Sequence, residues 1–160
     1  MYRIGFGSDT HRLVENRPLI LGGVEIPADK GAEGHSDADA LTHAVTDAIL
    51  GALALGDIGS HFPDTDERWK NADSFVFLRH TIGLMKEKGF RVANVDSVVH
   101  LEKPKLRPHI DKMRENLAQI LEIEMTEISV KAKTGEKMDA VGENRAVKSE
   151  AIIMLVKSAN

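Results

Sequence analysis

Residues 35–66, HSDADALTHAVTDAILGALALGDIGSHFPDTD, are the stretch around which the rest of the chain is organised. The pattern predicts one amphipathic helix followed by an acidic loop. Ser36 is expected to cap the helix start in a capping-box-like pairing with Asp39, and Gly56 is expected to end the helix. Apolar residues recur at helical spacing and predict its buried side: Leu41, Val45, Ala48, Ile49, Ala52 and Leu55.

A row of polar side chains follows the opposite side of this predicted helix. Asp39, His43 and Asp47 recur at intervals of four, so that a histidine stands between two carboxylates. His35 comes just before the helix. A solvated face is the simpler interpretation of the helix by itself, and the rest of the chain has to decide whether the row is a binding site.

Length and composition limit the possible functions. A chain of 160 residues, 42% apolar and 29% charged, fits one globular domain. Its net charge of -4 gives no general attraction to nucleic acid. Because there is no cysteine, any metal must be held by His, Asp or Glu. No signal-peptide pattern and no membrane-spanning apolar run is present, so a cytoplasmic location is expected.

Strand and helix patterns alternate along the chain. A hairpin is expected where Gly22-Gly23 can supply a two-residue turn, and the polar residues 28–34 and 134–145 are expected to be loops. The apolar run 152–156 predicts a strand that is buried on both faces. The sum is a single α/β (α+β) domain over residues 1–160, with a mixed sheet and helices packed on one face. The expected strands are 2–7, 19–26, 91–101, 128–132 and 146–157, and the expected helices are 73–88 and one that starts near Pro108.

A candidate metal site combines Asp9 and His11 with His43. Asp9 and His11 are two residues apart, so on an extended backbone both side chains point the same way. With His43 they would offer one oxygen and two nitrogens and leave one position open, which is typical of a catalytic zinc site. Other divalent metals accept the same ligands, and an Asp-x-His pair alone also occurs in ordinary surface turns.

A second candidate cluster is Lys-Ala-Lys-Thr-Gly-Glu-Lys at residues 131–137. Lysines and a threonine hydroxyl suit a phosphate, and the carboxylate of Glu136 suits Mg²⁺. Lys103 and Lys105, which flank Pro104, are a third candidate phosphate contact. An exposed, charged strand end is the alternative interpretation of both clusters.

Ordered motifs over nearly the whole chain resemble a known family, the 2-C-methyl-D-erythritol 2,4-cyclodiphosphate synthases of the non-mevalonate isoprenoid route. The matching motifs are G-x-G-x-D-x-H (5–11), L-G-G-V-x-I-P (21–27), H-S-D-x-D (35–39), H-x-x-x-D (43–47), G-A-x-A-L-G-D-I-G-x-x-F-P-D-T-D (51–66), A-D-S (72–74), P-H-I (108–110) and V-K-A-x-T-x-E-K (130–137).

The resemblance implies an enzyme that converts 4-diphosphocytidyl-2-C-methyl-D-erythritol 2-phosphate to the 2,4-cyclodiphosphate and releases CMP. It implies Zn²⁺, or another divalent transition metal, at Asp9, His11 and His43. It implies Mg²⁺ or Mn²⁺ at Glu136, on the substrate diphosphate. His35 and Thr134 match residues that stabilise the transition state. The resemblance also implies a homotrimer with active sites between subunits. With the net charge and the lack of a long apolar run, no nucleic acid or membrane partner is expected.

The same resemblance implies two sets of substrate contacts. The acidic loop matches contacts to the methylerythritol part, and the segments near 101–107 and 133–136 match contacts to the cytidine diphosphate part. The full set of expected substrate-binding residues is Asp9, His11, His35, Ser36, Asp57, Ile58, Gly59, Phe62, Pro63, Asp64, Thr65, Asp66, Lys103, Pro104, Lys105, Leu106, Ala132, Lys133, Thr134 and Glu136.

One segment departs from the family pattern of an aromatic residue followed by G-R-x-E-G. Ala140 stands at the aromatic position, Glu143 at the usual arginine and Arg145 at the usual glutamate. The two charges are exchanged, which would keep a salt bridge but reverse the field on a bound anion. Lys133, where the family often has threonine, adds a compensating positive charge. Two alternatives remain at this level: a metal-dependent phosphohydrolase that makes no cyclic product, and an idle module that binds a cytidine nucleotide or an isoprenoid phosphate.

Overall fold

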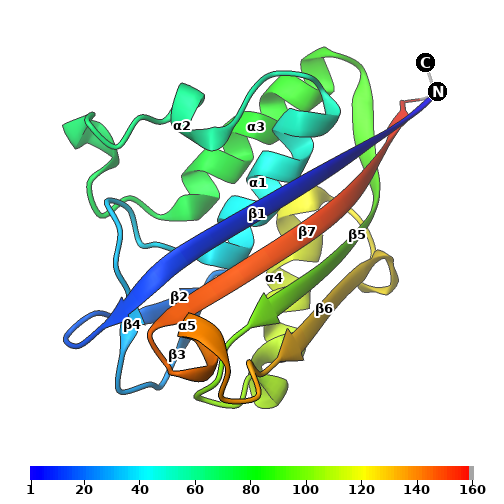
Figure 1. Cartoon of the computed structure of the whole chain (residues 1–160). Coiled ribbons are helices and arrows are strands. Elements are labelled where there is room, and N and C mark those ends of the chain that lie inside the picture. Colours follow the sequence, from blue (N-terminus) through cyan, green and yellow to red (C-terminus); the bar gives the residue numbers. More distant parts are fainter. Residues whose placement is uncertain (159–160) are drawn as a thin grey trace.

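The structure is a computed structural model that describes residues 1–158. A mixed sheet of five strands, in the order β4-β1-β7-β5-β6, carries three long helices on one face (Figure 1). The strands are β1 (Tyr2–Val14), β2 (Leu19–Leu21), β3 (Val24–Ile26), β4 (Gly31–Ala32), β5 (Phe90–His100), β6 (Ile128–Lys133) and β7 (Ala146–Lys157). The helices are α1 (Ala40–Ala52), α2 (Ile58–His61), α3 (Ser74–Glu87), α4 (Ile110–Leu121) and α5 (Asp139–Gly142), with 3-10 turns at Glu67–Trp69, Arg107–His109 and Met125–Glu127.

The strand pairing confirms the prediction of a mixed sheet. β7 lies antiparallel to both β1 and β5, whereas β5 and β6 run parallel. β2 and β3 form the expected hairpin, in which Gly22 and Gly23 both have positive φ, 56° and 70°. That combination gives a two-residue turn whose twist matches the flanking strands. No helix among the described residues is long and apolar enough to cross a membrane.

Helix α1 lies directly on the backbone of β1. A Cβ atom built on Gly5 would stand 1.8 Å from the carbonyl oxygen of Ala48, and one on Gly7 would stand 2.0 Å from that of Ala44. Only glycine permits this approach. Side chains alternate along β1, so Asp9 continues the glycine side and points to the start of α1. The close contact therefore sets where the first turns of α1 meet β1.

The start of α1 differs from the sequence-based expectation. Asp39, and not Ser36, is the N-cap, because Ala38 has a φ of 56° and the backbone before it is not helical. The fully buried Asp39 carboxylate accepts hydrogen bonds from the backbone N–H groups of Gly22, Gly23 and Thr42 and from the Thr42 hydroxyl. Burial raises the pKa of Asp39, although these hydrogen bonds act to lower it. One carboxylate thus joins the hairpin turn to the helix start.

The end of α1 also differs from the sequence-based expectation. The helix ends at Ala52 and not at Gly56, because Ala54 takes the left-handed conformation with a φ of 56°. The N–H of Leu55 then bonds back to the carbonyl of Leu50 at 3.0 Å, which closes the helix end. The expected apolar side is buried as predicted, with Leu55 half-buried against the core.

Three further expectations are wrong in their extent. β1 continues to Val14, since it pairs with β7 as far as Arg12. The 28–34 segment is not wholly a loop, because it contains the buried strand β4, which pairs with β1. The 134–145 segment contains the short helix α5. The expected helices 73–88 and near Pro108, and the expected strands 91–101 and 128–132, are present within one or two residues at their ends.

Strand β7 is buried on one face only, which corrects the prediction for the run 152–156. Ile153 is fully buried, whereas Ile152 is 50% exposed. The sheet face away from the helices carries other exposed apolar side chains, among them Tyr2, Ile4 and Phe6 of β1. No element within residues 1–158 covers these side chains. The continuous apolar run therefore belongs to two sheet faces with different surroundings.

Candidate functional site

Asp9, His11 and His43 meet between β1 and α1. His11 Nε2 lies 2.7 Å and His43 Nδ1 lies 3.0 Å from Asp9 Oδ2, and the two ring nitrogens are 3.3 Å apart. They are the only group of three His, Asp or Glu residues within residues 1–158 whose ligand atoms converge closely enough for a metal ion. Ligands about 2.0–2.1 Å from a tetrahedral ion stand about 3.3 Å from one another, and the three separations here, 2.7, 3.0 and 3.3 Å, reach or approach that value.

The hydrogen-bond partners decide which ring nitrogens carry protons. His11 Nδ1 is 2.8 Å from the carbonyl oxygen of Glu33, which can only accept, so Nδ1 carries the hydrogen and Nε2 presents a lone pair. His43 has hydroxyl oxygens near Nε2, which leaves Nδ1 facing Asp9. Two lone pairs and a carboxylate that face one another require a positive charge between them. The donor set therefore fits a divalent cation.

Without a cation, protons take its place in this group. Burial opposes the ionisation of Asp9, but hydrogen bonds from His11 and His43 outweigh it and hold the pKa of Asp9 far below its usual range. Burial alone would lower the pKa of His11, but the neighbouring Asp9 carboxylate raises it. A proton and a metal ion thus compete for the same place.

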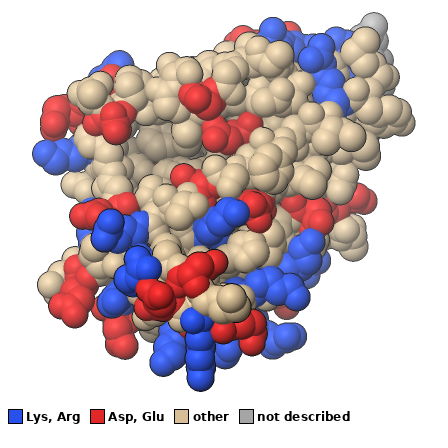
Figure 2. Space-filling view, in the orientation of Figure 1, with Lys and Arg blue, Asp and Glu red and all other residues tan. Residues whose placement is uncertain are grey.

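A pocket of about 440 Å³ opens beside the triad. Figure 2 shows it as a hollow between β1 and the loop that carries α2. Its wall is more apolar than polar and includes a ring cluster, in which Phe62 stacks on Phe77 with centroids 4.6 Å apart and Trp69 stands edge-on to both. Expected site residues that line it are Asp9, His11, His35, Ser36, His43, Ile58, Gly59, Phe62, Pro63 and Asp64.

Three acidic-loop residues from the expected substrate set do not line this pocket. Asp57 caps α2 by accepting from the Ser60 N–H and hydroxyl, and these bonds lower the pKa of Asp57. Asp66 binds Arg68, and its carbonyl oxygen lies 3.0 Å from His35 Nε2. Thr65 is exposed. In the described chain these three shape the loop, and they do not form its pocket wall.

Asp47 has a structural role that its place in the polar row did not reveal. Its carboxylate accepts from the N–H of Ile58 at 2.7 Å and so ties the acidic loop to α1. Burial raises the pKa of Asp47. Neither Asp39 nor Asp47 belongs to a solvated helix face, so the row predicted from the sequence is largely buried.

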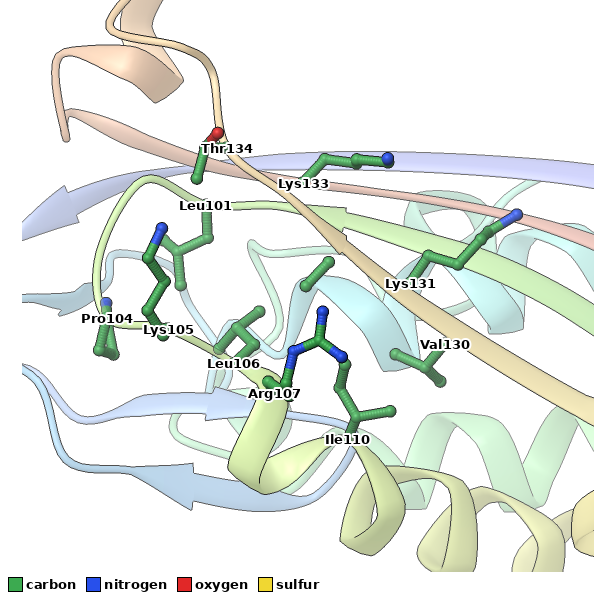
Figure 3. A pocket seen from close by; sticks show the side chains of 11 residues that line it. Leu101, Pro104, Lys105, Leu106, Arg107, Ile110, Val130, Lys131, Lys133 and Thr134 are labelled. Carbon is green, nitrogen blue, oxygen red and sulfur yellow. The ribbon is translucent and has the colours of Figure 1, made fainter.

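A second pocket, also about 440 Å³, lies where β5 and β6 end (Figure 3). Expected residues that line it are Pro104, Lys105, Leu106, Ala132, Lys133 and Thr134. Arg107, the last residue of the segment 101–107 that was expected to contact the cytidine diphosphate part, lines it as well. Among the described residues that line it there is no carboxylate, and three cationic side chains are not paired with an acid: Lys105, Arg107 and Lys133. The fourth, Lys131, is paired with Asp96 at 2.7 Å. The wall therefore suits an anionic ligand.

Lys103 and Glu136 are exposed and do not line this second pocket. The Glu136 carboxylate accepts from the hydroxyl of Thr134, which directs both groups to the same place beside the pocket. One exposed carboxylate cannot form a complete magnesium site. It can supply one ligand of an ion that is held mainly by substrate phosphates.

The two pockets share no residue and belong to opposite parts of the sheet. The triad uses β1, and the cationic pocket uses β5 and β6, with β7 between them. The exchanged charges near α5 do form a pair, since Arg145 Nη2 is 2.6 Å from Glu143 Oε2. The expected salt bridge between these two residues is therefore present.

Comparisons with known proteins agree with this geometry. The model of the YgbB family matches residues 2–156. The 2-C-methyl-D-erythritol 2,4-cyclodiphosphate synthase of Solibacter usitatus is 56% identical over 155 residues, which are 97% of this chain and 98% of that protein.

Several solved structures are similar over nearly all of this chain. The bifunctional IspDF from Campylobacter jejuni has a TM-score of 0.94 at 40% identity, over 100% of this chain and 43% of that one. A CDP-bound form of 2C-methyl-D-erythritol-2,4-cyclodiphosphate synthase has a TM-score of 0.89 at 42% identity, over 96% of this chain and 100% of that one. With its fold, its triad and its relatives in agreement, this chain belongs to the YgbB family, that of the 2-C-methyl-D-erythritol 2,4-cyclodiphosphate synthases.

Proposed function

We propose that this chain catalyses the reaction of its family, the closure of 4-diphosphocytidyl-2-C-methyl-D-erythritol 2-phosphate to 2-C-methyl-D-erythritol 2,4-cyclodiphosphate with release of CMP. An oxygen of the 2-phosphate forms a bond to the β-phosphorus. The bond from that phosphorus to the bridging oxygen breaks, and CMP leaves with that oxygen. The observation that carries the proposal is the triad, whose lone pairs converge beside a pocket in a chain 56% identical to a named synthase.

For this ring closure the protein has to neutralise phosphate charge, and it needs no strong general base. The attacking phosphate is already anionic, so the barrier comes from bringing two repelling phosphates together. Lys105 and Lys133 supply fixed positive charge at the second pocket, and Thr134 can donate a hydrogen bond there. When bound, Zn²⁺ at the triad and Mg²⁺ or Mn²⁺ at Glu136 would supply Lewis-acid charge to phosphate oxygens. Holding both phosphates in place favours ring closure over attack by water.

His35 and Thr134 are the residues proposed to stabilise the transition state. His35 lines the triad pocket, and its Nε2 is fixed by the Asp66 carbonyl, so its ring has a defined place at the wall. Thr134 lines the other pocket. A substrate that contacts both must therefore span two pockets. The expected methylerythritol contacts of Asp57, Thr65 and Asp66 would require loop movement or another subunit.

Assembly as a homotrimer with sites between subunits is part of the proposal. Two observations support it. The sheet face away from the helices exposes Tyr2, Ile4, Phe6 and Ile152, which a partner copy could cover. The triad and the cationic pocket also lie apart within one chain, and a partner could bring one chain's triad to another chain's cationic pocket. Sedimentation of the purified protein tests the assembly, with Ile4→Asp as the interface variant.

The deciding experiment is a phosphorus NMR time course with the cytidine diphosphate substrate, Zn²⁺ and Mg²⁺. Cyclic diphosphate and CMP should appear together and stop when a chelator is added. The His43→Ala variant should release no CMP while keeping the assembly of the parent protein. CMP with a linear phosphate product would replace the proposal by a phosphohydrolase. Binding without turnover would replace it by a module that only binds nucleotide, and turnover by His43→Ala would refute the metal assignment.

A further inference from the structure

A chain of hydrogen bonds leads from the triad into the protein and is not used by the proposed reaction. His43 Nε2, the ring nitrogen that faces away from Asp9, lies 2.7 Å from the Ser74 hydroxyl oxygen. The Ser74 hydroxyl in turn donates to the carboxylate of Asp37. Ser74 is fully buried at the first residue of α3, and His43 is only 8% exposed. The contact therefore joins three elements: α1, α3 and the turn before α1.

The partners of Asp37 fix the direction of this chain. Its Oδ1 also accepts from the N–H of Asp39 at 3.2 Å, and its Oδ2 accepts from the N–H of Ser74 at 3.1 Å. Both oxygens are thus acceptors, so the single hydroxyl hydrogen of Ser74 points to Asp37. The Ser74 oxygen must then accept from His43, whose Nε2 carries the hydrogen. The remaining lone pair of His43 is on Nδ1, 3.0 Å from Asp9 Oδ2.

We propose that Ser74 and Asp37 are positioning residues, which hold His43 in the one tautomer and ring orientation that can bind a metal through Nδ1. The inference rests on the proposed function, because it gives a role to residues behind the proposed metal ligand. Metal-binding histidines commonly donate their second ring nitrogen to an oxygen, which raises the basicity of the ligand. His11 achieves the same through the backbone carbonyl of Glu33, whereas His43 depends on side chains that substitution can remove.

Ser36 is a weaker second partner and does not replace Ser74. Its hydroxyl oxygen is 3.3 Å from His43 Nε2 and already accepts from the N–H of Ala38 at 3.2 Å. Among the described residues, no carboxylate accepts from the Ser36 hydroxyl and fixes its hydrogen. Loss of Ser36 should accordingly weaken metal binding less than loss of Ser74.

The test compares the zinc affinity of purified full-length variants by competition with a chromophoric chelator. Ser74→Ala removes the hydroxyl but keeps the N–H that bonds to Asp37. Its matched control is Thr81→Val on the same helix, because the buried Thr81 hydroxyl has no hydrogen-bond partner in the described chain. Zinc should bind about 10–100-fold more weakly to Ser74→Ala, and within about twofold of the parent to the control.

Asp37→Asn is the second variant, and it also serves if Ser74→Ala does not fold. In either orientation, the amide NH₂ group faces a backbone N–H that now bonds to the carboxylate, that of Asp39 or that of Ser74. The two orientations also offer the Ser74 hydroxyl either an acceptor or a donor, so the direction of its hydrogen is no longer fixed. Its control is Asp73→Asn, which removes the same charge from an exposed helix cap next to Ser74. Nitrogen NMR of the zinc-free proteins at alkaline pH should show His43 protonated only at Nε2 in the parent, and a mixture of tautomers in Ser74→Ala and Asp37→Asn.

The possible results separate this inference from the proposed function. Weaker zinc binding and mixed tautomers in both test variants, with both controls unchanged, support it. Parent-like affinity with a single tautomer in Ser74→Ala overturns it and leaves the metal site intact. An equal loss in the controls also overturns it, because the cause would then be the packing of α3. A parent protein that binds no zinc overturns both the metal assignment and this inference.

Discussion

Replacing Gly7 with alanine is expected to push α1 away from β1 and to break the metal site without touching a ligand. The new Cβ would stand 2.0 Å from the carbonyl oxygen of Ala44 and 2.8 Å from the backbone nitrogen of Ala48. A carbon and an oxygen that are not bonded rest about 3.3 Å apart or more, so α1 must move by roughly 1.3 Å. Both obstructing atoms belong to the helix backbone, so no side chain can move aside instead.

The displacement acts on His43, which directly precedes Ala44. Metal–ligand distances tolerate only about 0.2 Å, so a shift several times larger should remove His43 from the triad. Overpacking costs about 1–3 kcal/mol, occasionally more, and a clash with backbone belongs at the upper end. For a chain of this size that lowers Tm by about 6–12 °C. Zinc affinity should also fall at temperatures where the variant is still folded, because the displaced His43 no longer reaches the triad.

The assay is thermal unfolding with and without chelator, together with a zinc titration. Gly51→Ala is the matched control in the same helix, because its Cβ would meet only the Phe6 carbonyl oxygen, at an ordinary 3.7 Å. It should leave zinc binding unchanged and stabilise by about 0.5–1 kcal/mol, since alanine favours helix over glycine. A Gly7→Ala variant that keeps the parent's Tm and zinc affinity would show that α1 does not depend on this contact.

Three further results are expected. Asp39→Asn should cost about 2–4 kcal/mol in chemical unfolding, because an amide cannot accept all four hydrogen bonds and one N–H must face another donor; a loss below about 0.5 kcal/mol contradicts this. Gly83→Ala should raise Tm by a few degrees, since within residues 1–158 no atom outside the neighbouring backbone of α3 lies within 4 Å of the added Cβ; a lower Tm contradicts it. The zinc-free protein should lose stability between pH 6 and alkaline pH, and an Asp9→Ala variant should lose less.

The sign of the pH effect follows from the triad. The pKa of Asp9 is lowered, so its contribution is present above its unfolded value of 3.8 and is lost as the pH falls through the lowered value. The pKa of His11 is raised, so its contribution is present below 6.5 and is lost as the pH rises through the raised value. The pairing therefore stabilises the zinc-free protein most between these limits. An equal decline in Asp9→Ala would assign the effect to other groups.

Much of the site could be predicted because its signals are local. Asp9 and His11 stand two residues apart on a strand, and His43 stands on a strongly patterned helix, so period and spacing were enough to propose the triad. The Gly22-Gly23 turn was equally clear. The predicted start and end of α1 were wrong because Ala38 and Ala54 adopt the left-handed conformation. An alanine in an alanine-rich sequence gives no sign of that conformation.

Long-range partners could not be read from the sequence. The carboxylate of Asp39 is buried because a hairpin seventeen residues earlier returns to it, and nothing near Asp39 predicts that. Ser74 meets His43 across thirty-one positions, so its role appears only when α3 is packed on α1. The run Ile152–Val156 was read as wholly buried because apolarity alone does not tell a core face from a face left for another molecule.

Alternate residues of strand β1 have two independent roles, one on each face of the sheet. Its odd-numbered positions from Gly5 to His11 approach α1 and the triad, and its even-numbered apolar positions Ile4 and Phe6 face outward. The register of this strand is therefore constrained, because odd-numbered and even-numbered residues must keep to their own faces. Point substitutions can tune one face while the other is preserved, but a one-residue insertion or deletion near Gly5 would exchange the faces of every residue on one side of it. Evolution along β1 should proceed by substitution, with length changes confined to the loops at its ends.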